Sequence, residues 1–186
     1  MSPRFAHLSQ HDMTLDQQRV AQAVASGPRG GLRGPFHTLL RSPELADRVR
    51  HLGDYIRYEG IVPAPLRELA ILLVARHWSA SYEWHAHRRH AATAGLDPAI
   101  ADAIEVGARP EKLSADEALV YEFVSELLST GDVSDPTFDA AKARFGERML
   151  VELVGTAGYY SFIALVLNAS RTPLQEGATP LPPLTE

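Results

Sequence analysis

The sequence predicts an all-α fold, and three observations support that prediction. Helix-start signals recur along the chain, in which Ser, Thr or Asp precedes a proline or lies three residues before Glu or Gln. Alternating runs of Val, Ile and Thr, which are typical of strands, are missing from the sequence. The 186 residues are 45% hydrophobic and 22% charged, a balance typical of a folded domain with a real core.

The N-terminal part of the chain is expected to hold a helix, a loop and the start of a second helix. Thr14 and Gln17 form a capping box for a helix that runs to about residue 25. Glycine and proline then recur too densely over residues 26–35 for a helix to continue. Ser42 and Pro43 begin the next helix, because proline suits the first helical position. That helix runs to about residue 58, and its apolar side comprises Leu45, Val49, Leu52 and Ile56.

Two helices in the middle of the chain carry the polar residues of most interest. Pro63 opens the first, whose interior at residues 69–75 is apolar on every side and therefore buried all round. Ser79 or Ser81 is expected to cap the second, which spans about residues 82–94. Because the connection between them is short, the two helices should pack antiparallel.

Capping and breaking residues place the rest of the chain. Further helices are expected at about residues 98–106 after Asp97, after the capping box of Ser114 and Glu117, at about residues 136–145 after Asp135, and from Gly146 to about Asn168. Four prolines beyond residue 172 prevent the tail from being helical, so it is either an extended arm or disordered. The chain thus divides into an N-terminal helix and loop (1–33), a helical domain (34–170) and a proline-rich tail (171–186).

Composition excludes several classes of function. The formal charge is −5 and the sequence has no block of basic residues, so a nucleic-acid partner is not expected. The absence of cysteine removes disulfides, thiolate nucleophiles and iron–sulfur clusters. The longest apolar window, residues 149–167, contains Glu152 and is interpreted as a core helix rather than a membrane span. The N-terminus lacks the features of a secretory signal, and we therefore expect a cytoplasmic protein.

A carboxylate and an imidazole are spaced to share one face of the second middle helix. Glu83 and His87 are four residues apart, and His90 lies on the same stripe. Such a pair is most often a solvated surface pair, which is the alternative here. Glu68, on the preceding helix, shifts the balance towards a site, since a carboxylate next to a buried apolar segment must find a donor.

Four further residues are candidates for binding a substrate, and no metal or cofactor is expected. Arg67 and Arg76 are anion clamps or ordinary salt-bridge residues, and Tyr82 and His90 complete the candidate set. The acidic and histidine side chains of this region offer oxygen and nitrogen ligands. However, Glu83 and His87 are one residue further apart than the Glu-x-x-His pairs of di-iron helices.

In order along the chain, these residues resemble the carboxymuconolactone decarboxylase family, a branch of the alkylhydroperoxidase D-like superfamily. The likeness rests on Arg-Glu-Leu at 67–69, Tyr-Glu-Trp-x-x-His at 82–87 and Ala-x-x-x-Gly-Leu at 91–96. In layout it extends over about residues 34–168 and includes Gly-Tyr-Tyr at 158–160. The resemblance implies a homo-oligomer, commonly a trimer or hexamer. It also implies a lyase that decarboxylates a small carboxylated or lactone-type compound without a cofactor.

The peroxidase branch of the same superfamily carries Cys-x-x-Cys-x-x-x-His in the corresponding helix and a Glu on the helix before it. Here the histidine is His87 and the glutamate is Glu68, but the cysteine positions hold Ala80 and Glu83. A thiol peroxidase needs a thiolate and a resolving thiol, so that activity is not expected. The resemblance then implies Glu68, Glu83 and His87 as catalytic residues. The alternative is a non-catalytic small-molecule-binding or structural protein with the same fold.

Overall fold

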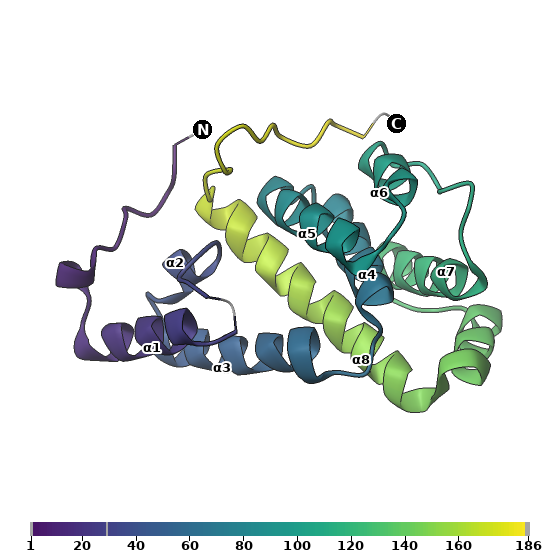
Figure 1. Cartoon of the computed structure of the whole chain (residues 1–186), viewed down its shortest axis with the longest axis horizontal. Helices are drawn as coiled ribbons and strands as arrows, with labels where there is room; N and C mark the ends of the chain where they lie inside the picture. The colour runs from purple at the N-terminus through teal and green to yellow at the C-terminus, as the bar shows by residue number, and fades with distance from the viewer. Residues whose placement is uncertain (1, 29, 185–186) are drawn as a thin grey trace. The chain divides into compact units, whose positions relative to one another are not determined.

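The computed structural model describes residues 2–28 and 30–184, and all regular secondary structure in that part of the chain is helical (Figure 1). This confirms the predicted all-α class. The elements in chain order are η1 (Gln10–Asp12), α1 (Leu15–Ser26), α2 (Phe36–Leu39), α3 (Pro43–Asp54), η2 (Tyr55–Glu59), α4 (Ala64–His77), α5 (Ser81–Ala94), α6 (Pro98–Glu105), α7 (Ala115–Thr130) and α8 (Asp135–Ser170).

The chain forms two compact units. Unit 1 comprises Met1–Gly60 and Leu165–Pro173, and unit 2 comprises Ile61–Ala164 and Leu174–Glu186. The first part of α8 belongs to unit 2 and its last turns belong to unit 1. The predicted boundaries after residues 33 and 170 stay a prediction.

Unit 1 is built on α3, against which α1 and α2 pack. The apolar side of α3 is not buried as a whole: Val49 and Ile56 are buried, whereas Leu45 and Leu52 are 45% and 51% exposed. Ala46 is fully buried and Gly53 is buried too, so the inward stripe runs through these small residues. Small side chains let the neighbouring helices approach α3 closely, and the stripe is rotated away from the two leucines.

Unit 2 is built around α4, which packs against α5, α6 and α7. Every residue from Glu68 to Arg76 is buried, which confirms the expectation of a helix covered on all sides. Burying such a helix removes a large apolar surface from water and is the main stabilisation of this unit. Glu68 and Arg76 mark the two ends of the buried stretch, so this core has one charged residue at each end.

Several predicted helix ends are confirmed by their hydrogen bonds, and two are not. Both capping boxes form, at Thr14 and at Ser114. The side chain of Ser42 makes no cap bond, although α3 begins after it as expected. The capping of α5 by Ser79 or Ser81 is wrong, because Ala80 occupies the N-cap position without a side-chain bond.

Ser81 is the first residue of α5 rather than its N-cap, and its side chain contacts the C-terminal tail. The Ser81 hydroxyl accepts a hydrogen bond from the backbone N–H of Leu181 at 3.0 Å. The imidazole Nε2 of His85 lies 2.5 Å from the carbonyl oxygen of Thr179. Residues 174–184 contain no helix, so the tail is an extended arm, one of the two predicted forms, and it is fastened to α5 within unit 2.

Gly146 interrupts α8 where the sequence predicts a break. Its φ of 77° and ψ of 164° lie outside the helical region, and glycine adopts such a backbone without steric cost. By length and composition α8 could cross a membrane, but half of its most apolar window is buried inside the structure. Such burial is compatible with the core helix of a soluble protein.

Candidate functional site

A buried ion-pair partner for the histidine comes from the neighbouring helix. Nδ1 of His87 on α5 lies 2.7 Å from Oε2 of Glu68 on α4. The two residues are 7% and 3% exposed, so the bond is shielded from water. An ionised carboxylate only accepts hydrogen bonds, so Nδ1 of His87 must carry the proton. Any exchange of a proton between His87 and another molecule therefore takes place at the other ring nitrogen, Nε2.

The charges around Glu68 keep it ionised in spite of its burial. Burial acts to raise the pKa of Glu68, but the hydrogen bond from His87 and the charges of His87, Arg67 and His90 outweigh it. The net effect is a pKa below the ordinary value. Nε of Arg67 is 3.7 Å from Oε1, the carboxylate oxygen that His87 does not use. Arg67 therefore acts on Glu68, the residue next to it.

Aromatic rings cover the imidazole of His87. Tyr160, on the part of α8 that belongs to unit 2, meets His87 edge-on with ring centroids 4.8 Å apart. His90 meets the same imidazole with ring centroids 5.4 Å apart. Tyr159 packs edge-on against Tyr160 at 5.1 Å. Sequence reasoning placed His90 correctly beside His87, but it did not assign a role to Tyr160, for which the only signal was the Gly-Tyr-Tyr triplet.

Glu83 is the second buried carboxylate of the site, and it has a different environment. It is 2% exposed, and neither carboxylate oxygen has a hydrogen-bond partner among the described residues. Burial raises the pKa of Glu83 well above its ordinary value. The four-residue spacing would allow Glu83 to meet His87, but Nδ1 of His87 is bonded to Glu68 instead. Burial therefore keeps Glu83, one helical turn from His87, protonated to a higher pH than an exposed glutamate.

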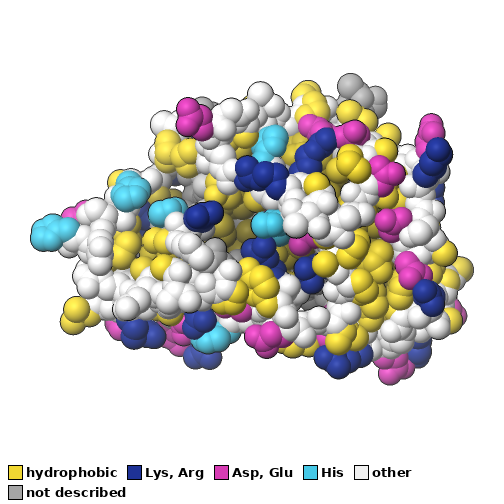
Figure 2. All heavy atoms as spheres, viewed as in Figure 1, with side chains coloured by type: hydrophobic (Ala, Val, Ile, Leu, Met, Phe, Trp, Pro, Cys, Tyr) yellow, Lys and Arg dark blue, Asp and Glu magenta, His cyan; other side chains and the backbone are white. Residues whose placement is uncertain are grey.

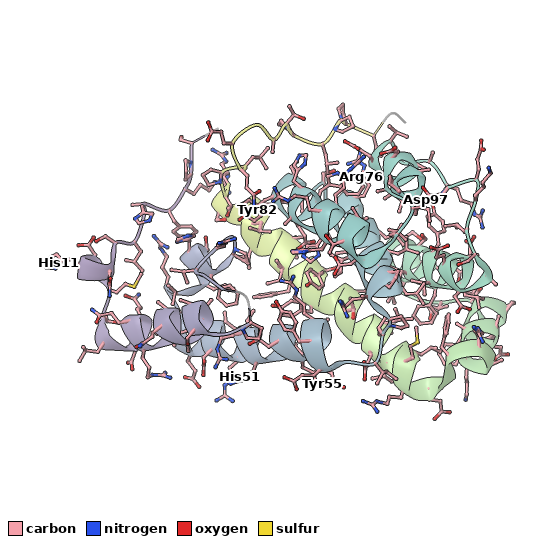
Figure 3. All side chains as sticks on the ribbon, in the orientation of Figure 1. His11, His51, Tyr55, Arg76, Tyr82 and Asp97 are labelled. Atoms are coloured by element: carbon pink, nitrogen blue, oxygen red, sulfur yellow. The ribbon has the colours of Figure 1, made fainter. Side chains whose placement is uncertain are left out.

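One of the candidate substrate-binding residues, Arg76, lies apart from the Glu68 and His87 pair. Arg76 is eight residues further along α4, which corresponds to about 12 Å of helix. Its guanidinium donates to the carbonyl of Pro182 at 2.8 Å and to the hydroxyl of Ser79 at 3.3 Å. Tyr82 is half-buried in the first turn of α5 (Figure 3). The structure therefore groups Arg67 and His90 with the pair and places Arg76 elsewhere.

The site holds two buried carboxylates in different surroundings, and the described residues form no cluster for a metal. Within residues 2–28 and 30–184, no group of three or more His, Cys, Asp or Glu side chains is arranged to hold a metal ion. Two carboxylates whose surroundings push their pKa values in opposite directions are the usual basis for acid and base roles at one pH. Here the pKa of Glu83 is raised, the pKa of Glu68 is lowered, and Glu68 accepts the hydrogen bond of His87.

Comparison with solved structures identifies the fold. A peroxidase-related protein from Ralstonia eutropha, described as an alkylhydroperoxidase AhpD core, superposes with a TM-score of 0.76 and 14% identity, covering 94% of this chain and 93% of that one. A peroxidase-related protein from Silicibacter has a TM-score of 0.76 and 12% identity, covering 96% of both chains. An Agrobacterium tumefaciens protein of unknown function, described as a putative antioxidant defence protein AhpD, has a TM-score of 0.65 and 16% identity, covering 77% of this chain and 99% of that one.

These likenesses show that the chain has the AhpD-like fold, as the resemblance implied. No family model and no curated protein matches the sequence. Two of the three neighbours are described as peroxidase-related, yet this chain has no cysteine with which to run a thiol cycle.

Proposed function

We propose that the protein is a cofactor-independent enzyme that uses Glu83 and the Glu68–His87 pair for acid–base chemistry on a small carboxylated or lactone-type compound. The observation that carries the proposal is the contrast between two buried carboxylates: Glu68 is bonded to His87, whereas Glu83 has no hydrogen-bond partner among the described residues. The pKa of Glu68 is lowered and that of Glu83 is raised accordingly. Buried carboxylates in opposite protonation states are costly to maintain and are typical of sites that move protons.

Decarboxylation is the reaction that these groups fit best. When a carboxylate leaves as carbon dioxide, the electrons of the broken carbon–carbon bond stay on the substrate as a dienolate. That anion needs a positive partner while it forms and a proton afterwards. Protonated His87, held by Glu68, supplies the positive charge. Glu83 supplies the proton, becomes a carboxylate, and is reprotonated from solvent before the next turnover.

Thiol peroxidase activity is not proposed, although two of the similar structures are described as peroxidase-related. A peroxidatic cycle forms and resolves a sulfenic acid, and no cysteine exists in this chain to do either. The AhpD-like fold is therefore combined here with a different set of reactive groups.

A non-catalytic binding or structural protein is the second candidate. Glu83 distinguishes the two functions, because a binding site has no use for an unpartnered acid that lowers stability. Whether Glu68, Glu83 and His87 open onto one cavity stays a prediction.

A screen for released carbon dioxide tests the proposal. Purified protein is incubated with carboxylated lactones and β-keto acids, and carbon dioxide is followed with time. The Glu83→Gln variant, of similar shape but without an acidic proton, serves as the matched control. Release by the wild type that exceeds release by this variant supports the proposal. Equal release across the whole panel would favour the binding protein.

The partners and location expected from the sequence remain part of this proposal. These are a small-molecule substrate, no nucleic acid, no membrane, a cytoplasmic location and a trimer or hexamer. On α8, Val151 and Val154 are 71% and 45% exposed, a face that a second copy of the chain would cover. Light scattering should give a multiple of 20.4 kDa, and a monomer at micromolar concentration would contradict the oligomer.

A further inference from the structure

A cleft lies at the end of α4 opposite to Glu68, within unit 2. Its volume is about 150 Å³. Apolar side chains of α4, α6 and α7 form most of its wall, among them Leu73, Ile104 and Leu128. Leu184 of the C-terminal arm lines it from the other side. A volume of this size accommodates a benzene ring or a short aliphatic chain.

A buried arginine lines the same cleft, and no carboxylate of the described residues forms an ion pair with it. Arg76 is 4% exposed, and its guanidinium bonds to neutral oxygens of Pro182 and Ser79 only. Its Nε has no partner, and no carboxylate of residues 2–28 and 30–184 lies within ion-pair distance. An arginine keeps its positive charge even when burial lowers its pKa, as it does here. A buried charge without a counter-ion is unfavourable, so the site favours an anion.

The nearest acidic group is already committed to another arginine. The charge of Glu105 on α6 acts on Arg76 and partly offsets the effect of burial. However, the Glu105 carboxylate is hydrogen-bonded to Arg88, which also binds Asp102. Figure 2 shows acidic and basic side chains side by side in this part of the surface. Glu105 is therefore part of a surface network, and within residues 2–28 and 30–184 no carboxylate is paired with Arg76.

We propose that this cleft is a binding site for a small monocarboxylate with an apolar body, whose carboxylate pairs with Arg76 and whose ring or chain lies against Leu73, Ile104 and Leu128. The site is separate from Glu68 and His87, and the proposal does not depend on the proposed enzyme function. Tyr121 and Ser125 add hydroxyl groups to the cleft, which can hydrogen-bond the second carboxylate oxygen. A largely apolar wall with a few convergent polar groups is the usual make-up of a small-molecule site.

The C-terminal arm is the fourth wall of the site. Its backbone is fastened by Ser81, His85 and Arg76, and its Leu184 lies so close to Gly107 that a Cβ at that glycine would collide with it. Arg76 thus holds the arm with one nitrogen while its Nε is unused. Binding of a carboxylate should order the arm further, since both bind to the same guanidinium.

The test compares two probes of similar shape. Benzoate carries a negative charge, and its amide, benzamide, is neutral. Binding to the full-length protein is followed by calorimetry and by methyl NMR shifts of the cleft leucines, up to about 10 mM probe. We expect benzoate to bind at least tenfold more tightly than benzamide, since a charge-assisted pair is stronger than a neutral hydrogen bond. Shifts should be confined to the methyl groups of Leu73, Leu128, Leu184 and Ile104.

Three variants give the proposal a clear outcome. Arg76→Met should remove the preference for benzoate, whereas Arg144→Met, the same change of charge at a surface arginine paired with Asp116, should leave it unchanged. Should Arg76→Met fail to fold, Leu128→Trp fills the cleft without altering Arg76, and it should abolish benzoate binding. Equal binding of the two probes by the wild type, or wild-type benzoate binding by Arg76→Met or Leu128→Trp, would overturn the proposal.

Discussion

The surroundings of Glu68 and those of Glu83 differ in one respect that decides their chemistry. Both carboxylates are almost completely buried, and their helices pack against each other. Glu68 is bonded to His87 at 2.7 Å and has Arg67 beside it, whereas Glu83 has no hydrogen-bond partner among the described residues. The pKa of Glu68 is lowered and that of Glu83 is raised.

Burial alone therefore does not set the charge of a carboxylate. Removal from water raises the pKa of either group, but a donor and nearby positive charges reverse the effect at Glu68. The same helix pair can therefore hold an ionised carboxylate and a neutral acid at one pH. It also follows that the two residues should respond in opposite ways to the same substitution.

The largest expected effect is on turnover. Once a substrate is found, Glu83→Gln and His87→Ala should each lower kcat by about 10²–10⁴-fold, the usual size of a lost acid or base. Glu68→Gln should be milder, since an amide oxygen still accepts a bond from His87. Steady-state kinetics on the three variants measures the relative size of these losses of kcat. Glu111→Gln, at an exposed glutamate, is the control. Unchanged turnover in both Glu83→Gln and His87→Ala would show that the pair is only structural.

The next largest effect is on stability, when the paired carboxylate is removed. Glu68→Leu should lower the free energy of unfolding by about 3–5 kcal/mol, because it leaves a buried imidazole without its acceptor. Urea unfolding followed by circular dichroism measures this loss. A loss below about 1 kcal/mol would mean that the bond between Glu68 and His87 contributes little, as at an exposed pair.

The matching change at the unpaired carboxylate should have the opposite sign. Glu83→Leu removes two buried oxygens that no group satisfies, and it should raise the free energy of unfolding by about 1–3 kcal/mol. The same urea experiment applies, with activity lost in this variant. Destabilisation as large as that of Glu68→Leu would indicate that Glu83 has a partner of its own.

A smaller effect is expected on the pH dependence of the free energy of unfolding, to which Glu83 and Glu68 should contribute with opposite signs. Since the folded pKa of Glu83 is raised, its contribution is complete below the ordinary pKa of 4.5 and declines as the pH rises through the folded value. The decline is about 1.4 kcal/mol per pH unit for one proton. Since the folded pKa of Glu68 is lowered, its contribution is present above 4.5 and is lost on acidification.

Two variants show which residue causes each slope of the free energy of unfolding against pH. Unfolding by urea at a series of pH values should show that Glu83→Gln removes the decline above about pH 4.5, whereas Glu68→Gln removes part of the loss on acidification. Equal slopes for the wild type and Glu83→Gln between about pH 5 and 7 would be inconsistent with a protonated Glu83.

Local signals in the sequence were sufficient for the helical fold, whereas the roles of Glu68, Glu83 and His87 stay predictions. The capping boxes at Thr14 and Ser114 and the break at Gly146 depend on neighbouring residues only, and all three were predicted. The apolar surroundings of Glu68 predicted its need for a donor. Which donor it finds depends on how α4 and α5 pack, and the four-residue spacing alone suggested Glu83 rather than Glu68 as the partner of His87.

Contacts between distant parts of the chain account for what the sequence did not predict. Ser81 is the first residue of α5 rather than its cap, and its hydroxyl accepts a hydrogen bond from Leu181, a residue a hundred positions later. Tyr160 reaches His87 from α8, and Arg76 is enclosed with the help of Pro182. A pattern read along one helix has no information about such partners, and only the fold brings them together.

Carbon-13 NMR of the side-chain carboxyl carbons measures the protonation states of Glu68 and Glu83 in the folded protein directly. Protein labelled at the glutamate carboxyl carbon is titrated from acidic to alkaline pH, and the Glu68→Gln and Glu83→Gln variants assign the two buried resonances. At neutral pH, Glu83 should have the chemical shift of a protonated acid and Glu68 that of a carboxylate. Two carboxylate shifts at neutral pH, or a protonated Glu68, would contradict the acid and base roles proposed for these residues.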